Sequence, residues 1–252
     1  SSELETLNSE LESFSYSISH DLRAPLRAIT GFTGFVLRKY RDQLPEDAVH
    51  HLDQVMKGGN QMNDLIEGLL QFSRIQRAEL KRRNCNMGEL ARGLMADLQT
   101  TMPERRVDVI WGKLPAAFAD PTLIRQVWQN LLSNALKYTG KRPSAIIEVG
   151  AKMSDDGETV YYVKDNGAGF DMSQSERLFG VFQRFHAQSQ FEGTGIGLAN
   201  VSKIIQRHGG RIWAEAEVDQ GARFYFVLGT DASVVSKPGD STIMQAPQRK
   251  SS

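Results

Sequence analysis

Apolar residues recur at intervals of three and four along the first part of the chain. They are Leu4, Leu7, Leu11, Phe14 and Ile18. This spacing places them along one side of an α-helix and is typical of the seam between paired helices. We therefore expect residues 3 to about 42 to form one long helix that packs against another helix.

A second amphipathic segment follows a break at residues 44–47, where Pro45 suits the start of a helix. Residues 46 to about 80 carry apolar side chains at helical spacing. They are Leu52, Val55, Met62, Leu65, Ile66, Leu69, Phe72 and Ile75. Two such helices form an antiparallel hairpin, which cannot bury both apolar stripes alone. We expect two chains to pair into a four-helix bundle; the alternative is an intramolecular coiled coil packed on the rest of the chain.

The position of the turn fixes which residues of the two helices face each other. If it centres near residue 45, His20 lies opposite about residue 70. Gly58 and Gly59 then lie opposite Gly31 and Gly34. Each glycine costs roughly 1 kcal/mol relative to alanine inside a helix. We infer that the helices approach closely at this level or that the level is pliable.

Composition excludes several classes of protein. The chain has 252 residues with 30 basic and 30 acidic side chains, so its net charge gives no general attraction to nucleic acid or to an anionic membrane. We predict no nucleic-acid partner. The single cysteine, Cys85, rules out an intrachain disulfide framework. No apolar run approaches the roughly 18 to 20 residues that span a bilayer, so we predict no membrane segment.

The pattern changes after a link expected at residues 81–86. Helices are predicted at 89–98, 121–138 and 195–208, and strands at 107–111, 116–119, 146–151, 159–164, 211–217 and 222–228. These elements predict an α/β sandwich, a mixed sheet with helices on one face. We divide the chain into a helical-hairpin dimerisation domain (1–82), an α/β sandwich domain (83–230) and a disordered tail (231–252).

The helix predicted at 121–138 carries candidate ligands for a nucleotide. Asn130 and Asn134 are four residues apart and share one helix face. An amide carbonyl is a neutral oxygen ligand that suits Mg²⁺ when phosphates supply the other ligands. Lys137 can contact phosphate, and Tyr138 offers a ring to a purine. The alternative is two ordinary helix-surface amides.

A second motif follows directly after the strand at 159–164. Asp165 can accept a hydrogen bond from an exocyclic amine, and Gly167 and Gly169 allow the backbone to approach a ligand closely. The alternative is a simple turn at the end of a strand.

A third motif opens the last predicted helix and consists of Gly193, Thr194, Gly195, Ile196, Gly197 and Leu198. Amides at a helix N-terminus next to glycine form a cradle for an anion. The spacing fits neither a P-loop nor the dinucleotide-binding glycine motif.

The stretch around His20 continues the first helix. Asp21 follows His20 directly, and Pro25 stands five residues after it. A lone exposed histidine usually has no role, but this one precedes three nucleotide motifs. The stretch resembles the phosphoacceptor box of two-component sensor histidine kinases. The later motifs, with a phenylalanine-rich segment between the last two, resemble the N, G1, F and G2 boxes of the Bergerat ATP fold. The phenylalanines are Phe179, Phe182 and Phe185.

The resemblance covers about residues 8 to 229 and implies ATP and Mg²⁺ as cofactors. It implies that Asp165 recognises the adenine amine, that Asn134 binds Mg²⁺, and that Asn130 and Lys137 complete the metal and phosphate site. Tyr138 would flank the base. The glycines of the third motif would form a mobile lid. Relatives often carry an arginine near the phosphates, where this chain has His186 and Ala187. Either Arg184 fills this role or the contact with the phosphates is weaker. The sequences of residues 20–26 and 191–198 are also similar to those of kinases that follow phytochrome-like or PAS-type sensors.

The activity implied is phosphoryl transfer from Mg-ATP to His20, with Asp21 accepting a proton from the ring. The phosphate would then pass to an aspartate of a response regulator receiver domain. The resemblance further implies a homodimer, a cytoplasmic location and a sensor domain upstream of this sequence. At Ala24, phosphatase-competent relatives commonly carry Thr or Asn, so we expect weak dephosphorylation of the partner.

Two other functions stay open. A non-catalytic dimer scaffold would bind ATP without transferring phosphate. An ATPase of the chaperone or topoisomerase branch would need a water-activating carboxylate where this chain has Asn130.

Overall fold

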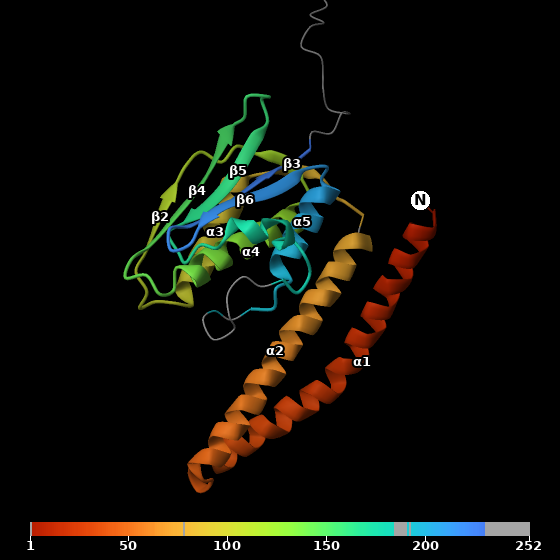
Figure 1. The fold of residues 1–252 in the computed structure, drawn as a ribbon, viewed down its shortest axis with the longest axis vertical. Coiled ribbons are helices and arrows are strands. Elements are labelled where there is room, and N and C mark those ends of the chain that lie inside the picture. The colour runs from red at the N-terminus through yellow and green to blue at the C-terminus, as the bar shows by residue number, and fades with distance from the viewer. Residues whose placement is uncertain (1, 78, 184–190, 192, 230–252) are drawn as a thin grey trace, which may run out of the picture.

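The first part of the chain is a hairpin of two long helices (Figure 1). The computed structural model describes residues 2–77, 79–183, 191 and 193–229. Helix α1 (Ser2–Tyr40) continues through Pro25. After the short 3₁₀ helix η1 (Arg41–Gln43), helix α2 (Glu46–Arg77) runs back along α1. Both helices predicted from the apolar spacing are confirmed.

Contacts between α1 and α2 fix the register of the hairpin. The guanidinium of Arg23 donates to the carboxylate of Glu67. Farther along, a Cβ added at Gly34 would lie 3.7 Å from Met56 Cε. The helices run antiparallel, so moving three residues back from Arg23 on α1 corresponds to moving three residues forward from Glu67 on α2. The backbone of His20 therefore lies at the level of residue 70. The predicted register is therefore confirmed.

The glycines of the hairpin behave in two ways. A Cβ added at Gly59 would lie 2.4 Å from Thr30 Cγ2, so the helices approach closely there. Gly31 and Gly58 have no atom within 4 Å of such a Cβ, so they leave open surface. The expected close approach therefore involves Gly59 and Gly34, and the other two glycines do not take part in it.

The second part of the chain is built on a five-stranded mixed sheet with strand order β2-β4-β5-β7-β6. The strands are β2 (Val107–Trp111), β4 (Ala145–Met153), β5 (Thr159–Asp165), β6 (Arg211–Glu217) and β7 (Gly221–Val227). β2 runs parallel to β4, and the other neighbours pair antiparallel. β5 is the middle strand of the sheet, and Asp165 stands at its end.

Three helices pack on one face of this sheet (Figure 1). They are α3 (Met87–Thr100), α4 (Pro121–Tyr138) and α5 (Gly197–Arg207). Trp128 of α4 is fully buried, and its ring centroid lies 6.3 Å from that of Tyr161 and 5.3 Å from that of Phe226. Asp120 caps α4 by accepting hydrogen bonds from two backbone amides. A short 3₁₀ helix, η2 (Met172–Arg177), follows β5. The predicted α/β sandwich is confirmed.

The prediction of a link at residues 81–86 is wrong for residues 83–85, which form a strand. Strand β1 (Arg83–Cys85) pairs antiparallel with β3 (Ala117–Ala119), and Cys85 is buried. The Lys81 amide donates to Asp120 Oδ2 at 2.9 Å. A strand of three residues with one buried side chain carries no recognisable alternation, so its partner strand defines it. The segment that joins the two parts is therefore shorter than expected.

The α/β part rests on α2. A Cβ added at Gly68 would lie 2.9 Å from Ile196 Cδ1, so this glycine gives Ile196 room to pack on the helix. Gln71 accepts a hydrogen bond from Asn200 Nδ2 at 3.3 Å and donates one to Gln126 Oε1 at 3.1 Å. The start of α5 therefore meets α2 near the level of His20.

Some predictions concern residues that the structure does not describe. Residues 231–252, predicted as a disordered tail, and Arg184, predicted near the phosphates, lie outside the described ranges. Among the described residues, no helix combines the length and apolar character needed to cross a membrane.

Candidate functional site

A cleft opens between α4, the ends of β5 and β7, and the segment that leads into α5. Eleven of the residues predicted from the three nucleotide motifs line it. They are Asn130, Asn134, Lys137, Tyr138, Asp165, Gly169, Gly193, Thr194, Gly195, Gly197 and Leu198. The three motifs, which lie far apart in the sequence, therefore form one site.

Asp165 lines this cleft and has 3% of its surface exposed. Its Oδ1 accepts a hydrogen bond from the Gly167 amide at 2.8 Å. Burial raises the pKa of Asp165 to about 6, although the Gly167 and Ala222 amides and the charge of Arg142 act in the opposite direction. The carboxylate is therefore mainly ionised at neutral pH and can accept a hydrogen bond from a ligand.

The two asparagines of α4 supply neutral oxygen ligands to the cleft. Asn130 Nδ2 donates to the Gln126 carbonyl at 2.9 Å, which directs Asn130 Oδ1 toward the start of α5. A Cβ added at Gly197 would lie 2.5 Å from this Oδ1, so glycine keeps the space in front of the oxygen open. Asn134 lines the same cleft one turn farther along α4.

This donor set fits Mg²⁺ bound together with phosphates. Among the described residues, no group of three or more His, Cys, Asp or Glu side chains could hold a metal ion. Mg²⁺ usually takes few protein ligands and keeps substrate phosphates and waters as the others. Two amide oxygens on one helix face satisfy that requirement, provided that the nucleotide supplies the remaining oxygens.

An aromatic wall with two cations closes one side of the cleft. The Tyr138 ring lies 5.1 Å from the ring of Phe191, centroid to centroid. Lys137 Nζ lies 4.2 Å from the Tyr138 centroid, and Lys141 Nζ lies 5.1 Å from the Phe191 centroid. The rings offer a flat apolar surface to a planar base, and the two ammonium groups attract anionic phosphates.

The glycine segment before α5 has the backbone conformation that its composition predicts. Gly193 has a φ of 152° and Gly195 a φ of 73°, values that side-chain-bearing residues rarely adopt. A Cβ at Gly193 would lie 3.1 Å from Lys137 Nζ. Gly193, four residues before α5, therefore lies next to a lysine. The ammonium group of this lysine attracts an anion, as do the amides at the N-terminus of α5.

Two glycines of the second motif serve the fold more directly than they serve a ligand. A Cβ at Gly167 would lie 2.7 Å from the Tyr138 carbonyl oxygen, and one at Gly169 would lie 1.8 Å from the Glu217 carbonyl oxygen. Gly169 still lines the cleft, but Gly167 does not. Their small size lets the loop after β5 pack against the end of α4 and the end of β6.

Other predicted residues lie away from the cleft. Ile196 does not line it, because its side chain packs on Gly68 of α2. His20 and Asp21 lie on α1; the structure describes the backbone of His20, and the Asp21 side chain is exposed.

Six residues of the cleft were not predicted from the sequence. They are Phe170, Leu178, Gln183, Phe191, Ala222 and Phe224. Most are apolar, and nothing in their residue type or spacing along the sequence distinguishes them from core residues. Their place in the cleft follows from how β7 and the loop after β5 pack.

The chain thus combines a helical hairpin with an α/β part whose cleft is lined by all three predicted nucleotide motifs. Residues 10–78 match the family model of the His Kinase A (phospho-acceptor) domain. Residues 119–232 match that of the Histidine kinase-, DNA gyrase B-, and HSP90-like ATPase. The chain belongs to the two-component sensor histidine kinases.

Individual relatives agree with this placement. The chain is 34% identical to cyanobacterial phytochrome A of Nostoc sp. over 226 residues. The aligned region covers 90% of this chain and 29% of that protein. It is 37% identical to the methanogenesis regulatory histidine kinase FilI of Methanothrix harundinacea over 230 residues. This aligned region covers 90% of this chain and 26% of that protein. The chain thus spans less than a third of the length of these curated relatives.

A solved structure is similar over most of the chain. Full-length ShkA in complex with AMPPNP superposes with a TM-score of 0.64 at 25% sequence identity, over 86% of this chain and 45% of that one. The similarity extends over both the hairpin and the α/β part, since neither alone makes up that share of the chain.

Proposed function

We propose that this chain phosphorylates itself on His20 with ATP and then passes the phosphoryl group to an aspartate of a response regulator receiver domain. The observation that carries the proposal is the placement of the cleft. The lid residue Ile196 contacts α2 at Gly68, and the backbone of His20 lies at the level of residue 70. The nucleotide cleft and the acceptor therefore lie at the same height along the hairpin.

In the transfer step, a neutral imidazole nitrogen of His20 attacks the γ-phosphorus of ATP. The bond between this phosphorus and the β–γ bridging oxygen breaks, and ADP leaves. Asp21 accepts the proton from the other ring nitrogen, which keeps the attacking nitrogen basic. A bound Mg²⁺ would neutralise phosphate charge.

Different residues of the cleft bind the base, the metal and the phosphates of the nucleotide. Asp165 accepts a hydrogen bond from the adenine 6-amino group, and Tyr138 flanks the base. Asn134 and Asn130 hold Mg²⁺, and Lys137 pairs with phosphate. The glycine segment and the α5 N-terminus cover the phosphates.

The working unit is a homodimer formed through the hairpin. Large apolar side chains on the outside of α1 and α2 support this, since a lone hairpin leaves them in water. They include Leu22, Ile29, Phe32, Phe35, Val55 and Met62, of which Phe32 is 75% exposed. We further propose a sensor domain upstream and a cytoplasmic location, as expected for a kinase that meets a receiver domain.

The functional division of the chain follows the predicted domains. Residues 1–82 provide dimerisation and the acceptor, and residues 83–230 bind ATP. Pairing of β1 with β3 supports the proposal that Arg83–Cys85 belong to the ATP-binding part.

The test is transfer of label from γ-labelled ATP. The native chain should take up label that is labile in acid and stable in base, and His20→Gln should take up none. His50→Gln is the matched control: it removes a histidine near the start of α2, remote from the cleft, and should label normally. Label that persists in His20→Gln would overturn the assignment of the acceptor. ATP binding without label in the native chain would favour the non-catalytic scaffold.

A further inference from the structure

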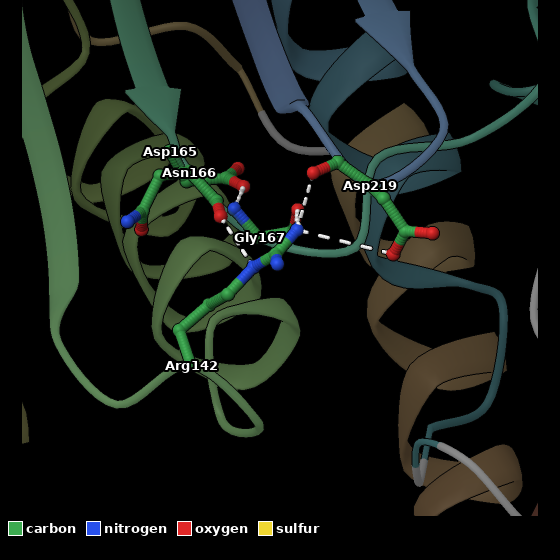
Figure 2. Close-up of polar contacts among 5 residues, drawn as sticks. All are labelled: Arg142, Asp165, Asn166, Gly167 and Asp219. Atoms are coloured by element: carbon green, nitrogen blue, oxygen red, sulfur yellow. Dashed lines mark hydrogen bonds and ion pairs between the residues drawn. The ribbon is translucent and has the colours of Figure 1, made fainter.

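Arg142 lies in the turn after α4 and binds the loop that follows β5 (Figure 2). Its Nε donates to the Asn166 carbonyl oxygen at 2.8 Å, and its Nη2 donates to the Gly167 carbonyl oxygen at 2.9 Å. The same Nη2 also donates to the Asp219 carbonyl oxygen in the turn between β6 and β7. One guanidinium thus joins three backbone carbonyls from two separate segments.

The peptide group between Asn166 and Gly167 connects Arg142 to Asp165. Its carbonyl oxygen accepts from Arg142 Nε, and its N–H donates to Asp165 Oδ1 at 2.8 Å. Because a peptide group is planar, a donor that fixes its oxygen also fixes the direction of its N–H. Figure 2 shows this chain of contacts from the guanidinium to the carboxylate. Hydrogen bonds in such a chain polarise and strengthen one another.

The turn at Asp219 holds the same loop from the other side. The Asp219 amide donates to the Ala168 carbonyl oxygen at 2.7 Å, and Asp219 has a φ of 61°. Its carboxylate Oδ1 lies 3.9 Å from Arg142 Nη2, and this side chain is 80% exposed. Backbone contacts therefore dominate the link, and a weak exposed ion pair adds little to it.

We propose that Arg142 is a positioning residue for adenine recognition. It orients the peptide between Asn166 and Gly167, and this peptide orients the Asp165 carboxylate toward the 6-amino group of a 6-aminopurine nucleotide. The inference rests on the proposed function of Asp165. Arg142 does not line the cleft, so it acts on the nucleotide through Asp165.

Lysine cannot replace Arg142 in this role. A guanidinium presents its donors in a rigid planar fork, which matches carbonyls in two segments. A lysine ammonium keeps the positive charge but has a single nitrogen and no fork. Arg142→Lys therefore separates the effect of charge from the effect of geometry.

The experiment compares two diphosphates that differ in the 6-amino group. Binding of ADP and of purine riboside 5′-diphosphate to the whole chain is measured by titration calorimetry with Mg²⁺ present. In Arg142→Met, affinity for ADP should fall by about tenfold, the typical effect of one hydrogen bond to a charged group, while affinity for the purine analogue should change less than about twofold. Arg142→Lys should also lose the preference for ADP.

A second readout is the pH profile of ADP binding. The charge of Arg142 lowers the pKa of Asp165, so Arg142→Met should move the acid limb of ADP binding to higher pH. Arg211→Met is the matched control, because Arg211 pairs with Glu158 at the far end of β6. It should change neither affinity.

Each outcome is decisive. Equal losses for both nucleotides in Arg142→Met, or no loss for either, would overturn the proposal for Arg142. An unchanged preference for ADP in Asp165→Asn would instead overturn the function proposed for Asp165, which separates the two failures.

Discussion

Asp165 should make the ligand-free protein less stable at neutral pH. Its pKa of about 6 in the folded chain exceeds the value of 3.8 for an ordinary aspartate. The folded state therefore binds the proton more tightly than the unfolded state does, and stability falls as pH rises through this window. Replacing Asp165 by Asn removes the ionisable group and with it this dependence on pH.

The size of the effect follows from the two pKa values. A difference of about two pKa units corresponds to about 3 kcal/mol, the cost of the ionised carboxylate at pH 7.5. At pH 4 the group is largely protonated in the folded state, and the cost is below about 1 kcal/mol. The advantage of Asp165→Asn over the native chain should therefore grow by about 2 kcal/mol between these pH values.

Urea unfolding of both proteins without nucleotide measures this difference. The three tryptophans of the chain, Trp111, Trp128 and Trp213, all lie in the α/β part, so their fluorescence reports its unfolding alone. Any fixed cost of the amide, such as a lost hydrogen bond to a backbone N–H, cancels between the two pH values. A difference in unfolding free energy that stays constant with pH would refute the reasoning.

Two further predictions use glycine pairs as internal controls. Gly59→Ala should destabilise the hairpin by about 1 to 3 kcal/mol, because its Cβ would lie 2.4 Å from Thr30 Cγ2. Gly58→Ala, which has open space, should stabilise it by up to about 1 kcal/mol, and the helical circular dichroism signal during melting distinguishes the two. Gly169→Ala should prevent folding of the α/β part, because its Cβ would lie 1.8 Å from a backbone oxygen at a φ of 60°. Gly157→Ala has a φ of 79° but open space, so it should cost only about 1 kcal/mol in urea unfolding; similar losses for both would contradict the steric argument.

The sequence was sufficient to predict features that repeat or that a motif carries. The hairpin followed from its apolar intervals, and its register followed from the turn alone. The shared cleft of Asp165, Asn130 and Asn134 could be predicted because each residue belongs to a short local motif. These positions converge on one cleft, as the motifs required.

Features that depend on distant backbone were not predictable in this way. β1 is a strand because β3 lies beside it, and three residues hold no pattern of their own. Arg142 binds carbonyl oxygens, which every residue possesses, so no motif marks its partners. Phe191 lines the cleft through tertiary packing, and its spacing in the sequence does not distinguish it from a core residue.

The packing of Ile196 on Gly68 has a thermodynamic consequence. Ile196 lies between Gly195 and Gly197, which line the cleft, while its own side chain contacts α2. A nucleotide bound in the cleft and a rotation of α2 that moves Gly68 would therefore both act on these three residues. By linkage, the free energy that couples them is reciprocal. If a change in the hairpin's conformation alters the nucleotide affinity by some factor, nucleotide binding must alter the hairpin's conformational equilibrium by the same factor.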